Sequence, residues 1–409
     1  MYYCNIYFLI VWIDELKESK IDLSLKRMDK FIEENGAPEY KIVHVGGTNG
    51  KGSVCQFIGN ILHRKYKVGI YTSPHLNRVN ERIVIDKKEI KDDEIEKYSY
   101  LKKYRFTYFE ALTAIAILYF KEKNVDYAVF EVGLGGRYDA TNVIESKLTI
   151  ITNVFKEHEK YLGNNICSIA KEKAGIIKNS PVITACRGKA LDVIKSIARK
   201  KEIKLYVVGE DVIYKKIGRK EFLVKAEREY KIKSPLEGDF QGENIAISVK
   251  AGEILGFEEK DIIEGIENAV WKGRMERIGK FLLDGCHNPH AVKSFTASLK
   301  NFDCGELIII FGVMKDKNVA GMIKNLPSAK SYIAVSIENE RSLPPQKIVE
   351  IGSKMGKKFI TAKNLREAIK KAENIAGKND IICVVGSLYL VGEALKILNE
   401  NGFTSFSRL

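Results

Sequence analysis

The sequence predicts an α/β protein with two successive parallel sheets and a small antiparallel insert. In the first part of the chain, apolar β-branched runs alternate with amphipathic helical runs, a pattern typical of parallel βαβ units. Between Leu205 and Ile232 the runs are short and β-like, and near Lys280 a second alternation begins. We therefore expect two domains, one over residues 1–270 that includes the insert and a Rossmann-like one over residues 271–409.

The first alternation supplies the elements of the first domain. The expected strands are Lys41–Val45, Val68–Tyr71, Asp126–Val132, Leu148–Val154 and Pro181–Ala185. The expected helices start near Gly52 and cover Phe109–Lys123 and Ile166–Ile177. The insert is expected to hold Leu205–Val208, Val212–Lys216 and Phe222–Val224, followed by helices over Gly242–Leu255 and Glu258–Ala269.

The second alternation predicts a strand followed by a helix five times. The expected strands are Lys280–Leu283, Leu307–Phe311, Tyr332–Val335, Lys358–Thr361 and Ile381–Val385. No long Pro- or Ser-rich linker separates the two alternations, so we expect a short hinge between Val270 and Arg274. The apolar run from Tyr2 to Ile13 is too short for a membrane span and lacks a basic leader, which favours a first helix.

Composition narrows the class of protein. With 409 residues, 45% apolar and 29% charged, the chain can bury a sizeable core. The net charge of +14 suits polyanionic ligands such as ATP, and the spread of Lys and Arg without an aromatic-interleaved block argues against nucleic acid. An odd number of cysteines without a CxxC spacing predicts a reducing cytoplasm; they are Cys4, Cys55, Cys167, Cys186, Cys286, Cys304 and Cys383. We expect a monomer that binds small molecules and no membrane.

A glycine-rich loop between an expected strand and an expected helix is the most informative segment. It reads His44-Val-Gly-Gly-Thr-Asn-Gly-Lys51-Gly-Ser53. Glycines let backbone N–H groups converge on phosphate oxygens at a helix N-terminus, Lys51 can neutralise β/γ-phosphate charge, and Ser53 offers a hydroxyl to Mg²⁺. The sequence therefore predicts a nucleoside triphosphate site that contains Gly50, Lys51, Gly52 and Ser53.

The spacing departs from the general phosphate-loop pattern, because Gly52 stands between Lys51 and Ser53. In this form the loop resembles the ATP loop of the Mur ligase superfamily, in the branch of folylpolyglutamate and dihydrofolate synthases. The resemblance implies a Mur-ligase-like central domain, a C-terminal glutamate-ligase domain, and MgATP. It also implies ATP-dependent addition of L-glutamate to a pteroate or folate carboxylate.

Three further segments resemble the family's metal site. Glu131 ends an expected strand, where open α/β sheets place ligand-binding groups. By resemblance it is the Mg²⁺ glutamate, and Ser73, in Thr-Ser-Pro-His-Leu, is a second ligand. His158 stands in Glu-His before Tyr-Leu-Gly, where the family has Asp-His, and is a further ligand with a catalytic role.

Acceptor-binding residues also follow from the resemblance. The turn after Glu131 carries Tyr138, Asp139 and Ala140, which match the family's pteridine-contacting loop. The segment Thr107, Tyr108, Phe109 and Glu110 resembles a pteroate-contacting segment, but it equally suits a capped helix start. Arg78, together with Arg82, is expected near the pterin or glutamyl substrate.

Lys173 lies in Glu-Lys-Ala-Gly-Ile, which resembles the segment whose lysine is carbamylated to N6-carboxylysine in this superfamily. Such a modification needs a neutral amine, and burial next to positive charge promotes it by lowering the pKa.

The second half of the chain carries the expected remainder of the ATP site. Asn244, in Gln-Gly-Glu-Asn, matches an adenine-contacting residue. Arg274 is the expected arginine that stabilises the transferred phosphoryl group. Asp284 and His287, in Asp-Gly-Cys-His-Asn-Pro, match the ribose-binding segment.

Two alternatives remain at this stage. One is a Mur-type or other amino-acid ligase that acts on a non-pterin carboxylate, against which the Ser-Pro-His-Leu and Asp-Ala-Thr-Asn segments argue. The other is a phosphate-loop ATPase or nucleotide-binding module without ligase activity, which leaves Lys173, Asn244 and Asp284 unexplained.

Overall fold

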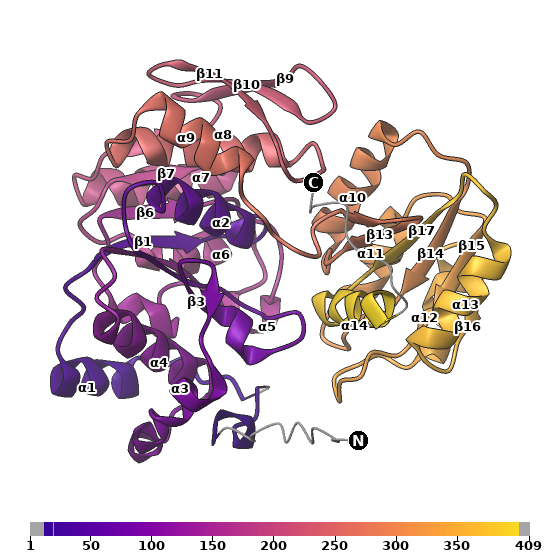
Figure 1. Ribbon diagram of the computed structural model, residues 1–409, viewed down its shortest axis with the longest axis horizontal. Helices are drawn as coiled ribbons and strands as arrows, with labels where there is room; N and C mark the ends of the chain where they lie inside the picture. Colours follow the sequence, from indigo (N-terminus) through magenta and orange to yellow (C-terminus); the bar gives the residue numbers. More distant parts are fainter. Residues whose placement is uncertain (1–11, 19, 401–409) are drawn as a thin grey trace, which may run out of the picture. The chain divides into compact units, whose positions relative to one another are not determined.

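The computed structural model describes residues 12–18 and 20–400 of the chain (Figure 1). The helix expected over Tyr2–Ile13 lies mostly outside these residues, and Trp12 begins a short 3-10 helix, η1 (Trp12–Glu15). Contacts group the described residues up to Ser73 with Val79–Val208 as unit 1, and Pro74–Arg78 with those from Gly209 onward as unit 2.

Unit 1 is built on an eight-stranded sheet in the order β4-β3-β2-β5-β1-β6-β7-β8. The strands from β2 to β8 in this order pair in parallel, whereas β3 and β4 are antiparallel additions at one edge. Their bounds are β1 (Lys41–Gly46), β2 (Val68–Tyr71), β3 (Ile83–Ile85), β4 (Lys88–Glu89), β5 (Tyr127–Glu131), β6 (Leu148–Ile151), β7 (Val182–Thr184) and β8 (Leu205–Val207).

The assignment of Leu205–Val208 to the antiparallel insert is wrong. Residue Leu205 pairs in parallel with Val182, so β8 extends the main sheet. The amphipathic helix α7 (Gly188–Lys200) precedes it and supplies the long crossover that parallel pairing requires. The sequence prediction did not include α7, so it also missed the βαβ unit that α7 forms with β7 and β8.

Helices cover both faces of this sheet. Ile42 of β1 packs with α1 (Lys26–Asn35) and α4 (Tyr108–Glu122), and Ile151 of β6 packs with α6 (Ile166–Lys173) and α7. Gly46, on the same side of β1 as Ile42, is opposite Ile151 in the ladder, so these helices share one face. Because crossovers between parallel strands are right-handed, α2 (Lys51–Leu62) lies on the other face of the sheet. The short helices are η2 (Val79–Arg82), α3 (Asp92–Glu96), η3 (Ser99–Tyr104), η4 (Ala140–Val143), α5 (Glu159–Leu162) and η5 (Ala174–Ile176).

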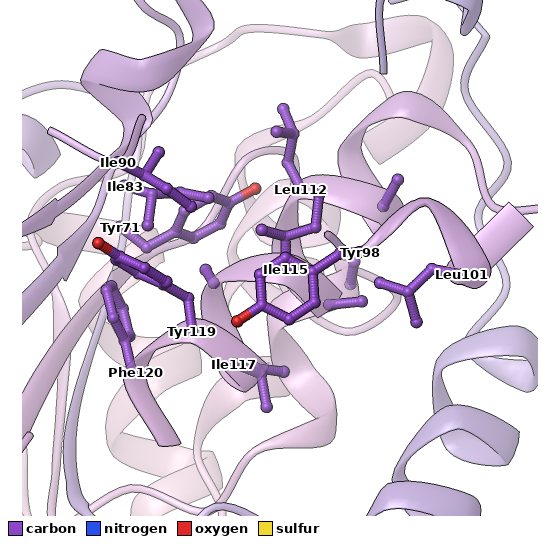
Figure 2. Packing of buried hydrophobic residues seen from close by; sticks show 14 of the residues in the cluster. Tyr71, Ile83, Ile90, Tyr98, Leu101, Leu112, Ile115, Ile117, Tyr119 and Phe120 are labelled. Carbon is purple, nitrogen blue, oxygen red and sulfur yellow. The ribbon is translucent and has the colours of Figure 1, made fainter. Parts of the chain in front are cut away.

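An apolar cluster of unit 1 lies under α4, and the buried side chains of this helix surround its whole circumference. Figure 2 shows Leu112, Ile115 and Tyr119 of this helix packed among side chains from neighbouring segments. Tyr71 of β2 lies in the same cluster, and its hydroxyl is 3.2 Å from Thr113 Oγ1. The core therefore reaches the carboxyl end of β2, where the expected site begins.

Unit 2 starts with a three-stranded antiparallel sheet in the order β11-β10-β9. The strands are β9 (Ile213–Lys216), β10 (Glu221–Lys225) and β11 (Glu229–Lys233). Two helices pack on them, α8 (Gln241–Ile254) and α9 (Glu259–Glu267). A Cβ at Gly242 would lie 2.7 Å from the Tyr214 ring, so glycine lets α8 approach the sheet closely. The expected antiparallel insert is confirmed with two of its three predicted runs, and β11 is a strand that the prediction did not include.

A six-stranded sheet, in the order β12-β13-β17-β14-β15-β16, forms the rest of unit 2. All but the antiparallel β12 are parallel, which confirms the expected Rossmann-like alternation. One buried cluster holds α10 to α12, and another holds α13 and α14, so the two sets cover opposite faces. The strands are β12 (Glu276–Ile278), β13 (Phe281–Asp284), β14 (Leu307–Phe311), β15 (Ser331–Ala334), β16 (Phe359–Thr361) and β17 (Ile381–Val385). The helices are α10 (Pro289–Ser298), η6 (Leu299–Asn301), α11 (Val319–Asn325), α12 (Pro345–Lys354), α13 (Leu365–Ile375) and α14 (Leu388–Glu400).

The contacts divide the chain between Val208 and Gly209. The sequence places the domain boundary near residue 270, and this boundary stays a prediction. Within the described part of the chain, every helix is too short or too polar to cross a membrane.

Candidate functional site

The loop between β1 and α2 is built closely against the end of β6. Gly47 has a φ of +133°, and a Cβ there would lie 1.9 Å from Thr152 Oγ1. Gly50 takes a left-handed conformation, with a φ of 85°, directly before α2. Only glycine fits both conditions at Gly47, and the backbone N–H groups that follow lead into a helix N-terminus. This cradle fits a phosphate group.

Residues just past β6 hold this loop in place. The Thr152 hydroxyl donates to Asn49 O at 2.8 Å. The Asn153 side chain accepts from Asn49 N at 2.9 Å, and its backbone carbonyl accepts from Thr48 N at 2.8 Å. The sequence prediction gave Thr152 and Asn153 no role. The pattern that could have identified them is a Thr-Asn pair at the carboxyl end of a buried strand. Buried polar side chains need hydrogen-bond partners, and open α/β sheets bind ligands at this end of their strands.

Two lysines converge on carbonyl oxygens of the same loop. Lys51 Nζ donates to Thr48 O at 3.2 Å and lies 4.0 Å from Glu131 Oε1. Lys173 Nζ donates to Gly47 O at 2.7 Å, and this side chain is buried. Burial, and then the positive charge of Lys51, lower the pKa of Lys173 to about 8. The structure thus brings together the phosphate loop, Glu131 and the lysine expected to be carbamylated.

Hydroxyl and carboxylate oxygens near Lys51 have the chemistry of a Mg²⁺ site. Glu131 ends β5 and Ser53 lies in the first turn of α2, and both are buried. Glu131 Oε2 accepts a hydrogen bond from Ser73 N at 3.0 Å, so the two expected ligands are neighbours. Such hard oxygens fit Mg²⁺. Among the described residues, no group of three or more His, Cys, Asp or Glu comes together, so phosphate oxygens would have to complete the shell.

His158 lies after β6 and directly before α5. Its φ of 51° is left-handed, which is uncommon for a residue other than glycine. Its Nε2 lies 3.3 Å from Glu157 Oε1, and its side chain is 29% exposed. The expected pairing of imidazole and carboxylate is present, and metal ligation by His158 stays a prediction.

The turn expected to contact the pteridine is fixed by its own aspartate. Asp139 is buried and accepts from Leu134 N at 2.8 Å and from Thr141 N at 3.0 Å. Tyr138, next to it, is 45% exposed, and Ala140 is buried. The Asp139 carboxylate therefore shapes the turn, while Tyr138 remains accessible to a ligand.

The segment Thr107–Glu110 is a capped helix start, one of the two interpretations that the sequence left open. Thr107 N donates to Glu110 Oε2 at 2.7 Å, and Thr107 Oγ1 accepts from Glu110 N at 3.4 Å, which is a capping box. Arg27 of α1 donates from Nε to Glu110 Oε2 at 3.0 Å, a partner that the sequence prediction missed. Phe109 packs under the turn, since a Cβ at Gly133 would lie 2.5 Å from its ring. Tyr108 is buried, with the Arg82 guanidinium 5.2 Å from its ring centre.

Unit 2 holds the remaining expected residues. Asn244 is buried in α8 and donates from Nδ2 to Gln241 Oε1 at 2.8 Å, while Gln241 Nε2 has no partner. An unpartnered buried amide donor suits a nucleobase or another polar ligand. Arg78 lies in Pro74–Arg78, the short segment that contacts group with this unit.

Arg274 and Asp284 are close in space. The positive charge of Arg274 lowers the pKa of Asp284, although the larger effect of burial raises it overall. Asp284 ends β13 and accepts from Met275 N and from Cys286 N, both at 2.9 Å. His287 Nδ1 lies 2.9 Å from Gly285 O. The Asp284 carboxylate therefore holds the loop that carries Arg274.

Both halves of the chain match models of known protein families. The family model described as "Mur ligase middle domain" matches residues 45–252, and "Mur ligase, glutamate ligase domain" matches residues 273–388. The dihydrofolate synthase/folylpolyglutamate synthase of Bacillus subtilis (strain 168) is 34% identical over 95% of this chain and 97% of its own length. This chain belongs to the Mur ligase family, in its branch of folylpolyglutamate and dihydrofolate synthases.

Solved structures of this family have the same fold. "E.coli FolC in complex with DHPP and ADP" is 27% identical, with a TM-score of 0.88 over 96% of this chain and 97% of that one. A bifunctional folylpolyglutamate synthase/dihydrofolate synthase with Mn, AMPPNP and L-glutamate bound is also 27% identical, with a TM-score of 0.84 over 95% of this chain and 97% of that one. The predicted family and fold class are confirmed.

Proposed function

We propose that this chain is an ATP-dependent ligase that joins L-glutamate in amide linkage to a pteroate or folate carboxylate. The observation that carries the proposal is the convergence of Lys51 and Lys173 on the loop carbonyls, with the buried Glu131 4.0 Å from Lys51 Nζ. The relatives named above carry dihydrofolate and folylpolyglutamate synthase as their names, and two solved relatives hold nucleotides.

The chemistry requires activation, because a carboxylate is a poor electrophile in water. The acceptor carboxylate takes the γ-phosphoryl group of MgATP, which gives an acyl phosphate and ADP. The amino group of L-glutamate then attacks the acyl carbon, which forms the amide and releases phosphate and a proton. Lys51 would neutralise charge on the transferred group, and backbone N–H groups from Gly50 to Ser53 would hold the phosphates. Ser53, Ser73, Glu131 and His158 would hold Mg²⁺.

Residues of unit 2 have proposed roles in the same reaction. Arg274 would stabilise charge on the phosphoryl group, while Asn244, Asp284 and His287 would bind the adenosine part of ATP. Arg78, with Thr107–Glu110 and the turn around Asp139, would bind the acceptor. A carbamylated Lys173 would place an anion where its ammonium now contacts Gly47 O.

The alternative functions are less well supported. A Mur-type ligase with a non-pterin acceptor has the same phosphate loop, but the relative at 34% identity is named for folate substrates. A nucleotide-binding module without ligase activity gives no reason for the match of a glutamate ligase domain to residues 273–388. We further propose a cytoplasmic monomer, and the described cysteines are all free thiols, as a reducing compartment requires.

Phosphate release by the purified protein tests this function. We expect release only when ATP, L-glutamate and a pteroate or folate acceptor are all present. Lys51→Ala is the matched control, and it should lower turnover by about 10²–10³-fold or more, because the transferred group loses a fixed cation. Release without an acceptor would favour the ATPase alternative, and near-normal turnover of a folded Lys51→Ala protein would contradict the ATP site.

A further inference from the structure

His44 lies in the middle of β1, shortly before the phosphate loop, and no step proposed above uses it. Its side chain is 1% exposed. Its Nε2 lies 2.8 Å from Thr141 Oγ1, and Thr141 Oγ1 donates to Asp139 Oδ1 at 2.5 Å. A chain of hydrogen bonds between three buried side chains therefore joins the strand of the phosphate loop to the turn around Asp139.

The direction of these hydrogen bonds follows from the number of protons. A threonine hydroxyl has one proton, and an ionised carboxylate is an acceptor only. Burial raises the pKa of Asp139, and the hydrogen bonds that it accepts from Leu134 N and Thr141 N oppose this rise by favouring the ionised form. With Asp139 as the acceptor of the Thr141 proton, Thr141 Oγ1 accepts from His44. His44 must then be neutral with its proton on Nε2.

The surroundings of His44 keep it neutral. Burial is the larger cause and the positive charge of Lys178 the smaller one, and together they lower the pKa of His44 to about 3. The ring is therefore a permanent hydrogen-bond donor at Nε2 over the physiological pH range. It does not act as a proton carrier.

A second set of contacts, made through α6, also joins the turn around Asp139 to the phosphate loop. Arg137 N, in the turn, donates to Glu172 O of α6 at 2.9 Å. The next residue, Lys173, donates from Nζ to Gly47 O of the phosphate loop at 2.7 Å. Gly175 also lies against Arg137, since a Cβ there would be 2.5 Å from Arg137 Cα. The turn is thus fixed to the phosphate loop by His44 on one side and by α6 on the other.

We propose that His44 is a positioning residue that, through Thr141, sets the distance between the Asp139 turn and the phosphate loop. This inference rests on the proposed function, in which the turn binds the acceptor and the loop binds ATP. The acceptor carboxylate has to meet the γ-phosphate, and a misplacement of about 1 Å can cost about 10²-fold in rate. His44 touches neither substrate in this account.

Two substitutions separate positioning from a purely structural role. His44→Leu removes the donor at similar size, and His44→Gln keeps an N–H group near the position of Nε2. Ser180→Ala is the matched control, because Ser180 is also buried and shares hydrogen bonds with Ser146 and Thr149 in unit 1, but none with the loop or the turn.

We expect His44→Leu to lower kcat by about tenfold and to raise the acceptor KM, with the KM for ATP changed by less than about twofold. His44→Gln should recover most of the rate, and Ser180→Ala should change thermal stability alone. If folded His44→Leu protein keeps the wild-type kcat and acceptor KM, the proposal is wrong.

A spectroscopic measurement tests the same geometry without activity. The ¹⁵N shifts of the His44 ring should show one neutral tautomer, protonated at Nε2, from pH 5 to pH 8. Thr141→Val should alter these shifts, and Ser180→Ala should leave them unchanged. A proton on Nδ1, or titration in this range, would overturn the proposal even if the protein ligates glutamate. Failure of every acceptor to react would count against the proposed function and leave this test intact.

Discussion

Lys173 Nζ donates a hydrogen bond to Gly47 O at 2.7 Å and so joins α6 to a phosphate loop that precedes it by 126 residues. The sequence patterns of Lys173 and of the phosphate loop were identified separately. Their contact places the Lys173 amine in a buried position near Lys51, and both the burial and the positive charge of Lys51 lower its pKa. Lys51, the second cation, is fixed by the same loop.

Carbamylation of Lys173 should depend on pH. A pKa of about 8 makes about a tenth of the amines neutral at pH 7, compared with about 0.03% at an ordinary pKa of 10.5. The neutral amine attacks dissolved CO2 and releases a proton as the carbamate forms. With ¹³C-labelled CO2 held at a constant dissolved concentration, we expect a carbamate resonance whose rate of formation rises about tenfold from pH 6 to pH 7 and levels off above pH 8. Lys173→Ala should lack it and lose activity, which short carboxylic acids should partly restore. A modification rate that is still rising steeply above pH 9 would contradict the shifted pKa.

Gly47→Ala should abolish ATP binding in a chain that still folds. The added methyl group would lie 1.9 Å from Thr152 Oγ1, and the φ of +133° is rarely adopted by other residues. Gly256→Ala is the control, because its φ is +81° but nothing lies within 4 Å of the new atom. Calorimetric titration with ATP should show loss for the first and normal affinity for the second. Equal affinities would mean that this loop does not bind the phosphates as proposed.

The half-buried carboxyl group of Glu393 should make the stability of unit 2 depend on pH. Burial first, and Glu338 second, raise the pKa of Glu393 from 4.5 to about 7, and Glu393 Oε2 has no partner. The folded state therefore binds a proton that the unfolded state releases, so this group stabilises more as the pH falls from about 7 to about 4.5.

Glu393→Gln should accordingly raise the melting temperature at pH 8 and have less effect near pH 4.5. Glu373→Gln is the control, because this carboxylate of α13 is 36% exposed and lies 3.9 Å from Lys280 Nζ, and it should show no such difference. A Glu393→Gln shift of equal size at both pH values would contradict the raised pKa.

Most of the fold followed from local patterns in the sequence. The strands β14 and β17 have the predicted limits, because a continuous apolar run between polar residues leaves little choice of register. The strand β8 was predicted but assigned to the wrong sheet, because its three residues do not show which strand they pair with and the preceding helix α7 was missed.

The site was predictable only as a set of separate motifs. Lys51, Glu131 and Lys173 could be identified from their segments, whereas the contacts of Gly47 with Thr152 and of His44 with Thr141 arise from packing. The sequence does not show which residues these threonines and this histidine contact, because the partners are set by tertiary structure.

Arg274→Ala and Asp284→Ala test the contribution of unit 2 to the ATP site. If the Arg274 contact strengthens in the transition state, its loss should lower kcat more than it weakens ATP binding. Asp284→Ala should weaken ATP binding as well, and its stability has to be measured, because it also leaves Met275 N and Cys286 N without an acceptor. Unchanged kcat and ATP affinity in both variants would remove this part of the site.

The masses of the reaction products show whether this chain joins glutamate to a pterin carboxylate. Purified protein should be given MgATP, L-glutamate and a panel of dihydropteroate, folate and folate polyglutamates, with Lys51→Ala protein in parallel. We expect acceptors that are heavier by one or more glutamyl residues, formed only with ATP and only by the unchanged chain. The panel also decides between addition of the first glutamate and chain extension. ATP consumption with every acceptor recovered at its original mass would contradict the account.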